Sequence, residues 1–133
     1  MPITYLDVPE GATTGEKKAL VKAIYHALHD AYPFPDDVRI FIREWPPNSV
    51  SQDGLIGSEP ARPVLMMHVP QGIDLEAKRR MTKRINEAVV AAYHLPKFMI
   101  FIHEHPRDLV ALDGGLHSDN LQRVQAQKEI YGV

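Results

Sequence analysis

A proline stands directly behind the initiator methionine, in the segment Met1-Pro2-Ile3. Removal of Met1 would leave a secondary amine at the chain terminus, and terminal amines titrate at about pH 8 in model peptides. Partial burial or a neighbouring cation lowers that pKa because it disfavours the charged form. Pro2 is therefore the first candidate for a proton-transferring base at neutral pH. The competing interpretation is that Pro2 is an ordinary second residue with no chemical role. The other features of the chain decide between the two interpretations.

Four further polar candidates stand on two similar segments, residues 38–45 and 98–105. Arg43 and Trp45 occupy the positions that His103 and His105 occupy in the later segment. We predict either that these four side chains line a substrate pocket at a subunit junction or that they are ordinary interface residues. The two histidines have a spacing that suits a metal, but no third ligand is identifiable and no metal or other cofactor is expected.

The elements that must position these residues come from an internal duplication. The two halves of the chain align with one single-residue deletion near position 36. The repeated residues include Pro2, Val8, Pro9, Gly11, Lys17, Tyr32, Pro35, Glu44 and Gly54, which return as Pro63, Val69, Pro70, Gly72, Lys78, Tyr93, Pro96, Glu104 and Gly114. Matches that keep register over this length indicate two copies of one structural unit.

Each copy is typical of a strand, a helix and a strand. In the first, residues 3–8 form a short apolar strand, Thr13 and Glu16 make a capping box, and the helix runs to about Ala31. Residues 38–45 then alternate as a strand. The second copy repeats the plan with a strand at 64–69, a helix capped by Asp74 and ending near Tyr93, and a strand at 98–105.

These elements predict an α/β (α+β) fold, a tandem β-α-β repeat. Its four-stranded sheet has two helices on one face, because right-handed crossovers place both helices on the same side. One domain spans residues 1–133, with repeats at 2–54 and 63–115, a linker at 55–62 and a C-terminal tail at 116–133 that holds a short helix. The other sheet face carries Phe41, Trp45 and Phe101, so we expect it to be buried by oligomerisation.

Composition limits the classes of partner. The 15 Lys and Arg residues nearly balance the 17 Asp and Glu residues, so no broad positive surface favours nucleic acid or an anionic membrane. The chain has no cysteine, which excludes disulfides and thiol catalysis, and no apolar run of membrane-spanning length. A cytoplasmic protein is expected.

Taken together, the Pro2-Ile3 strand, the Glu10-Gly11 turn, the capped helix and the Val38-Arg39 strand resemble the tautomerase superfamily. The similarity is to its fused members related to 4-oxalocrotonate tautomerase and covers nearly all of residues 2–115. The resemblance implies a homotrimer, a processed Pro2 that acts as base or acid, and Arg39 as the residue that binds a substrate carboxylate or carbonyl oxygen.

The departures from the family pattern are informative. The family's second carboxylate-binding arginine follows the Glu-Gly turn, where this chain has Ala12 and, in the second copy, Ile73. Pro63 follows Arg62 inside the chain, so its nitrogen is an amide, and Met99 replaces Arg39. One competent proline per chain is therefore expected.

A second branch of the family, malonate semialdehyde decarboxylase, has an aspartate just before the strand, beside a cationic proline. Asp37 is the matching position here and Asp36 is possible, although a solvated turn carboxylate is an equal interpretation. That branch also has an arginine pair after its third strand, which Gln71 and Gly72 do not supply.

The sequence thus predicts an isomerase: Pro2 transfers a proton in keto-enol tautomerisation of a small 2-oxo acid or related carboxylate, with Pro2, Arg39 and Asp37 as catalytic candidates. The first alternative is a lyase, a decarboxylase or hydratase of a 3-oxo acid. The others are a non-catalytic ligand-binding or assembly module, and a ferredoxin-like dimeric barrel in which Pro2 has no role.

Overall fold

The computed structural model describes residues 1–95 and 97–133, so the predicted equivalence of Pro35 with Pro96 lies outside the described residues. The first half folds as strand β1 (Ile3–Pro9), helix α1 (Thr14–Ala31) and strand β2 (Arg39–Trp45). The predicted capping box is present, because Thr13 accepts from the Glu16 amide and Glu16 accepts from the Thr13 amide. The strand begins at Arg39 rather than at the predicted residue 38.

The second half repeats this order with strand β5 (Val64–Pro70), helix α2 (Leu75–Tyr93) and strand β6 (Met99–His105). Asp74 caps α2 as predicted, by accepting a hydrogen bond from the Ala77 amide. An equivalent ion pair clamps helix to strand in each half, Lys17–Glu44 at 2.5 Å and Lys78–Glu104 at 2.9 Å.

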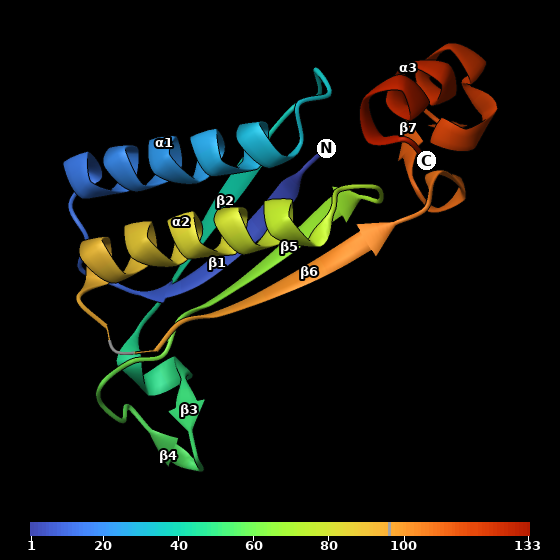
Figure 1. The fold of residues 1–133 in the computed structure, drawn as a ribbon. Coiled ribbons are helices and arrows are strands. Elements are labelled where there is room, and N and C mark those ends of the chain that lie inside the picture. The colour runs from blue at the N-terminus through green and yellow to red at the C-terminus, as the bar shows by residue number, and fades with distance from the viewer. Residues whose placement is uncertain (96) are drawn as a thin grey trace.

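The strands form one mixed sheet in the order β2-β1-β5-β6. Strands β1 and β2 are parallel, as are β5 and β6, whereas β1 and β5 run antiparallel. Figure 1 shows α1 and α2 side by side across one face of this sheet. Because Ile3 pairs with both Arg39 and His68, the start of β1 lies beside the start of β2 and the end of β5.

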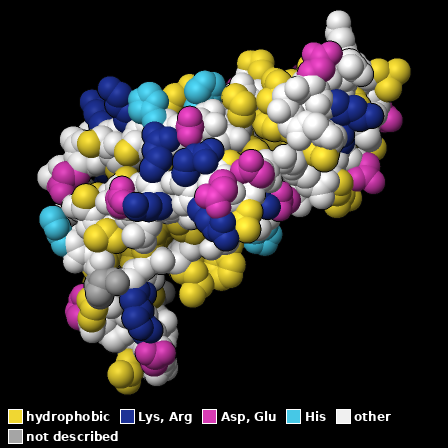
Figure 2. All heavy atoms as spheres, viewed as in Figure 1, with side chains coloured by type: hydrophobic (Ala, Val, Ile, Leu, Met, Phe, Trp, Pro, Cys, Tyr) yellow, Lys and Arg dark blue, Asp and Glu magenta, His cyan; other side chains and the backbone are white. Residues whose placement is uncertain are grey.

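Alternating side chains divide the sheet into a buried face and an open face. The core lies between the sheet and the two helices and includes Leu6, Ile24, Leu65, Met67 and Ile85, none of which is exposed. The opposite face is uncovered and leaves Phe41 and Phe101 each 45% exposed. The outer surface of the helices instead carries Lys and Arg mixed with Asp and Glu (Figure 2).

Two small hairpins follow the sheet strands, and each straddles a predicted repeat boundary. Hairpin β3–β4 joins Ser51–Gln52 to Leu55–Ile56, so it enters the segment predicted as a linker. Hairpin β7–β8 joins Ala111–Leu112 to Gly115–Leu116 in the same way. Short 3-10 turns (η) lie at Pro47–Ser49, Arg107–Leu109 and His117–Asp119.

The predicted tail helix is α3 (Leu121–Tyr131), which begins at the cap residue Asn120. Its end packs against the turn after β5, where Gly72 has a φ of +120° and a Cβ would stand 2.6 Å from Val133 and 2.7 Å from Tyr131. The equivalent turn glycine, Gly11, has nothing within 4 Å of that position. The tail therefore covers only one end of the sheet, the end at which β5 finishes and β1 starts.

Candidate active site

The start of β1 brings Pro2 to a protected position at one end of the sheet. The Pro2 side chain is less than 2% exposed, and its carbonyl accepts a hydrogen bond from the Arg39 amide at 3.1 Å. The loop between α1 and β2 passes the same end and carries Asp36 and Asp37. Helix α3 approaches from the other side, since the Phe34 amide donates to the Tyr131 hydroxyl at 3.2 Å. Two segments distant in sequence thus enclose the amino terminus.

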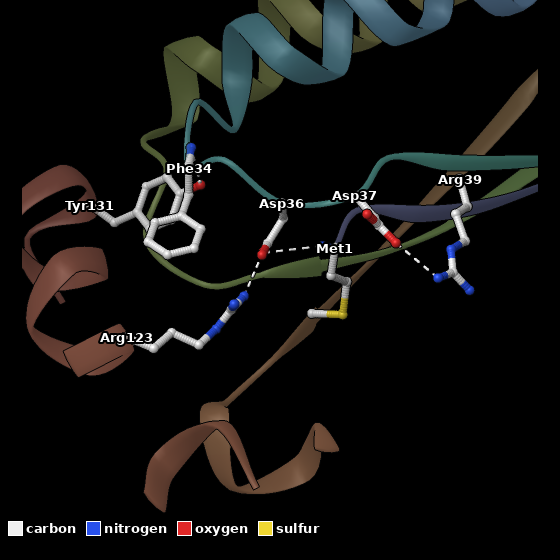
Figure 3. Close-up of polar contacts among 7 residues, drawn as sticks. All are labelled: Met1, Phe34, Asp36, Asp37, Arg39, Arg123 and Tyr131. Carbon is white, nitrogen blue, oxygen red and sulfur yellow. Dashed lines mark hydrogen bonds and ion pairs between the residues drawn. The ribbon is translucent and has the colours of Figure 1, made fainter. Parts of the chain in front are cut away.

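The terminal amine of the unprocessed chain faces Asp36. The Met1 nitrogen is 3.1 Å from Oδ2 of Asp36, and the two side chains are each only 13% exposed. The same carboxylate oxygen accepts a hydrogen bond from Nη2 of Arg123 on α3. Figure 3 shows Asp36 between Met1 and Arg123. Of the two aspartates that the sequence offered, Asp36 is therefore the one that contacts the amine of the unprocessed chain.

Burial and charge oppose one another at this cluster. Burial lowers the pKa of the Met1 amine below its ordinary value, although the hydrogen bond that this amine donates to Asp36 acts in the opposite direction. Burial would raise the pKa of Asp36, but hydrogen bonds from Arg123 and from the terminal amine outweigh it and hold that pKa below its usual range. The site thus combines an ionised carboxylate with a Met1 amine whose pKa is lowered.

Asp37 turns away from the terminus and pairs with Arg39. Their contact is 2.8 Å between Oδ2 and Nη2, and the two side chains are 68% and 61% exposed (Figure 3). An ion pair this exposed contributes little to stability, typically about 0–1 kcal/mol. Arg39 is the first residue of β2 and lies near Pro2, because its amide donates to the Pro2 carbonyl. Its exposed side chain is available to bind another anion.

Arg43 and Trp45 lie at the far end of the open face, where both donate to Asp7. The guanidinium contacts the two carboxylate oxygens at 2.9 and 2.8 Å, and Nε1 of Trp45 is 2.7 Å from Oδ1. Trp45 also lines a cavity of about 180 Å³ beside Pro63. Because the Pro63 nitrogen is an internal amide, that cavity has no basic amine.

His103 and His105 lie at the Pro2 end, and β5 adds His68 to them. Nδ1 of His68 and Nε2 of His105 are 2.9 Å apart, and the rings of His68 and His103 are 5.3 Å apart between centroids. Within one chain, the predicted pocket residues thus divide into two pairs at opposite ends of the open face. A pocket that contains both pairs requires two chains.

The histidine cluster gives stability a pH dependence. Burial, followed by the charges of His105 and His103, lowers the pKa of His68. A histidine whose folded pKa is depressed favours the folded state above its ordinary value of about 6.5, and this contribution is lost as the pH falls. We therefore expect the urea midpoint of the wild type to fall more steeply from pH 7.5 to 5 than that of His68→Gln. The control His26→Gln, on the exposed surface of α1, should show the same pH dependence of the urea midpoint as the wild type. The same dependence in His68→Gln would contradict the prediction.

Within residues 1–95 and 97–133, no three His, Asp or Glu side chains are arranged so that they could hold a metal ion. No helix in this part of the chain is long and apolar enough to cross a membrane.

Sequence reasoning missed three residues that the structure adds to these clusters. Arg123 lies in a tail outside the duplication, so no repeat signal marks it. Asp7 and His68 occupy equivalent positions on β1 and β5, opposite Arg43 and His103 in the strand register. Alternation along those strands could have placed both on the open face.

No protein-family model matches this sequence, and no curated protein matches it. Solved structures do match this chain. A wild-type fused 4-OT, an asymmetric trimer, matches with a TM-score of 0.78 at 21% identity, over 87% of this chain and 96% of that one. Malonate semialdehyde decarboxylase matches with a TM-score of 0.67 at 16% identity, over 94% of this chain and 98% of that one.

A third structure, Pt0534 inactivated by 2-oxo-3-pentynoate, matches with a TM-score of 0.70 at 18% identity, over 86% of this chain and 94% of that one. These likenesses show that the chain has the tautomerase fold in its fused, two-unit form, which confirms the fold predicted from the sequence. At these identities, the fold is what the comparison establishes.

Proposed function

We propose that the protein is a tautomerase-like enzyme in which Pro2, freed by removal of Met1, transfers a proton on a small 2-oxo acid. One observation carries the proposal: Pro2 is buried at an enclosed end of the sheet, where the Met1 amine that precedes it contacts the Asp36 carboxylate and has a pKa that burial lowers. Once Met1 is removed, we expect burial at this end of the sheet to lower the pKa of the Pro2 amine in the same way, which would favour its use as a base. The fold shared with fused 4-OT supports the same conclusion.

The proposed reaction needs only residues of this chain. The Pro2 nitrogen takes the proton from the enol hydroxyl or from the carbon next to the ketone, and the resulting ammonium returns a proton to the other position. Arg39 stabilises the negative charge that develops on the enolate oxygen between the two transfers. Atoms balance, because the reaction moves one proton and consumes no co-reactant.

We also propose that the protein works as a homotrimer. The fused 4-OT structures include symmetric and asymmetric trimers. In this chain, the open sheet face leaves Phe41, Trp45 and Phe101 more than 40% exposed. Burial of aromatic side chains is a main source of interface stability, so exposed aromatic side chains on an uncovered sheet face favour an interface there. Oligomerisation would also bring the Trp45 end of one chain near the histidine end of another.

Decarboxylation or hydration of a 3-oxo acid is the second candidate, and Asp36 is the observation that favours it. Asp36 contacts the Met1 amine in this structure, and the same carboxylate beside a processed Pro2 would stabilise its ammonium form, which is the form that such a reaction uses to polarise a carbonyl. The competition between burial and Asp36 therefore decides between the two functions: a neutral Pro2 supports tautomerisation and a charged Pro2 supports decarboxylation.

Intact mass measured before and after treatment with 2-oxo-3-pentynoate tests the proposal. We expect native protein to lack Met1 and to gain one equivalent of reagent per chain at neutral pH, with the modified peptide beginning at Pro2. The reagent is suitable because one structural neighbour was solved after inactivation by it. Native protein that retains Met1, or that is not modified at Pro2, would contradict the proposal and favour the binding module.

A further inference from the structure

The cavity of about 180 Å³ beside Pro63 lies at the end of the sheet away from Pro2. Its wall is formed by the ends of β1 and β2, by residues of the β3–β4 hairpin region and by the segment that leads into β5. Figure 1 shows this hairpin at the end of the molecule opposite to α3. The wall described here belongs to a single chain, and it is separate from the candidate active site.

A network around the Gln52 side chain holds one side of this cavity in place. The amide nitrogen of Gln52 donates to the carbonyls of Ser58 and Pro60 at 3.3 and 3.0 Å, and its amide oxygen accepts from the Arg62 amide at 2.7 Å. These bonds tie β3 to residues 58–62. The cavity is therefore formed before a ligand binds, which reduces the conformational entropy that binding costs.

The charged groups of the wall are largely paired with one another. The Asp7 carboxylate accepts three hydrogen bonds from neighbouring side chains, and the Arg62 guanidinium contacts Asp53 at 2.8 Å. Among the described residues, those that line the cavity include two carboxylates, Asp7 and Glu59, and one guanidinium, Arg62. The wall thus has no surplus of positive charge that would attract an anion.

The remaining lining side chains are mostly apolar, and they include Val8, Pro9, Trp45, Val50, Ala61 and Pro63. An apolar cavity of about 150 Å³ is large enough to bind benzene. The cavity in this chain is slightly larger, so one aromatic ring with a small substituent matches its volume. Such a ring also gains attraction from contact with an indole, beyond the area that it buries.

We propose that this cavity is a second, non-catalytic site that binds a small neutral molecule with one aromatic ring. The duplication gives the chain two equivalent sheet ends, and Trp45 and Pro63 stand at one of them where His105 and Pro2 stand at the other. Because the Pro63 nitrogen is an internal amide, a molecule bound here meets no basic amine. The site is therefore independent of the proposed function.

Fluorescence of Trp45 tests this site directly, because Trp45 is the only tryptophan of the chain and lines the cavity. The probe is benzyl alcohol, which is neutral and has one ring. We expect a saturable change in emission with a Kd below about 1 mM, as is reasonable for so small a ligand. Benzoate, an anion of similar size, should bind about 10-fold more weakly or worse, because its charge loses water without gaining a free cation.

A matched pair of variants locates the binding. Val50 lines the cavity, and Val110 holds the equivalent position in the second half, outside it. Val50→Phe fills part of the cavity and should weaken benzyl alcohol binding by 10-fold or more. Val110→Phe adds the same side chain elsewhere and should change the affinity by less than about 2-fold. Both variants retain Trp45 as the reporter.

No saturable change in the wild type would overturn the proposal, as would happen if a second copy of the chain fills the cavity in an oligomer. Equal effects of the two variants would overturn it too, and benzoate binding as tight as that of benzyl alcohol would overturn the ligand class. If Val50→Phe does not fold, nuclear Overhauser contacts between benzyl alcohol and the Trp45 indole of the wild type replace the variant, and their absence would overturn the proposal.

Retention of Met1 separates this inference from the proposed function. Met1-retaining and processed protein should bind benzyl alcohol equally, because the Pro63 cavity does not change when Pro2 becomes the terminus. Failure of Pro2 to react with 2-oxo-3-pentynoate would therefore contradict the proposed function alone. Loss of benzyl alcohol binding in Met1-retaining protein would place the ligand at the Pro2 end and overturn the second site.

Discussion

Protein that retains Met1 is expected to be inactive, with kcat/KM for enol-keto conversion of phenylpyruvate reduced by about 10²–10⁴-fold, the usual contribution of a positioned general base. An amide nitrogen has no basic lone pair, so Pro2 can accept a proton only as the chain terminus. The structure adds a second reason, because the Met1 side chain is only 13% exposed and precedes Pro2 at the enclosed end of the sheet, where it would obstruct a substrate. Both effects reduce activity.

The sharpest test uses a single preparation. Met1-retaining protein is assayed, treated with methionine aminopeptidase and assayed again, while intact mass follows the loss of Met1. Activity should rise in proportion to the processed fraction. Pro63→Ala is the matched control, because Pro63 holds the equivalent place in the second half but is an internal amide. Equal activity before and after processing would contradict the role of Pro2.

The fold could be predicted from the sequence because its signals are local and occur twice. The capping box at Thr13 and the cap at Asp74 mark where the helices begin, and hydrophobic alternation marks the strands. The duplication then predicts the layers, since two crossovers of one hand place both helices on one face, but it leaves open the strand order and the antiparallel pairing of β1 with β5. The remaining errors lie at element ends, such as the β3–β4 hairpin inside the predicted linker.

The site was less predictable because it depends on contacts between distant segments. Asp36 and Asp37 are adjacent in sequence, and only the direction of the loop decides which one faces the terminus. Arg123 is 87 residues from Asp36 and belongs to a tail that the duplication does not cover. Side chains brought together by such packing have no periodicity or spacing that the sequence could reveal.

Substitution of Arg39 is expected to have the second-largest effect. Arg39→Gln should lower kcat/KM for phenylpyruvate by about 10²-fold, the scale of one lost donor to a developing oxyanion. Its side chain is 61% exposed and its only described ion pair is with Asp37, so the free energy of unfolding should change by no more than about 1 kcal/mol. Activity measured beside urea denaturation separates the two effects, and full activity in Arg39→Gln would remove Arg39 from the site.

The partner of Arg39 distinguishes the two candidate reactions. If Asp37 only pairs with Arg39 on the surface, Asp37→Asn frees the guanidinium and should change kcat/KM by less than about 5-fold, as expected for an exposed ion pair worth up to about 1 kcal/mol. If Asp37 acts in decarboxylation of a 3-oxo acid, the same substitution should abolish carbon dioxide release. Asp36→Asn has a different expected result. Asp36 contacts the Met1 amine in this structure and is expected to stabilise the Pro2 ammonium once Met1 is removed, so the substitution should lower the pKa of Pro2 in the pH-rate profile. If the protein is a tautomerase, Asp36→Asn should therefore keep its activity down to a lower pH, because Pro2 stays neutral there. If it is a decarboxylase, the same substitution should lower its activity, because the reaction depends on the Pro2 cation.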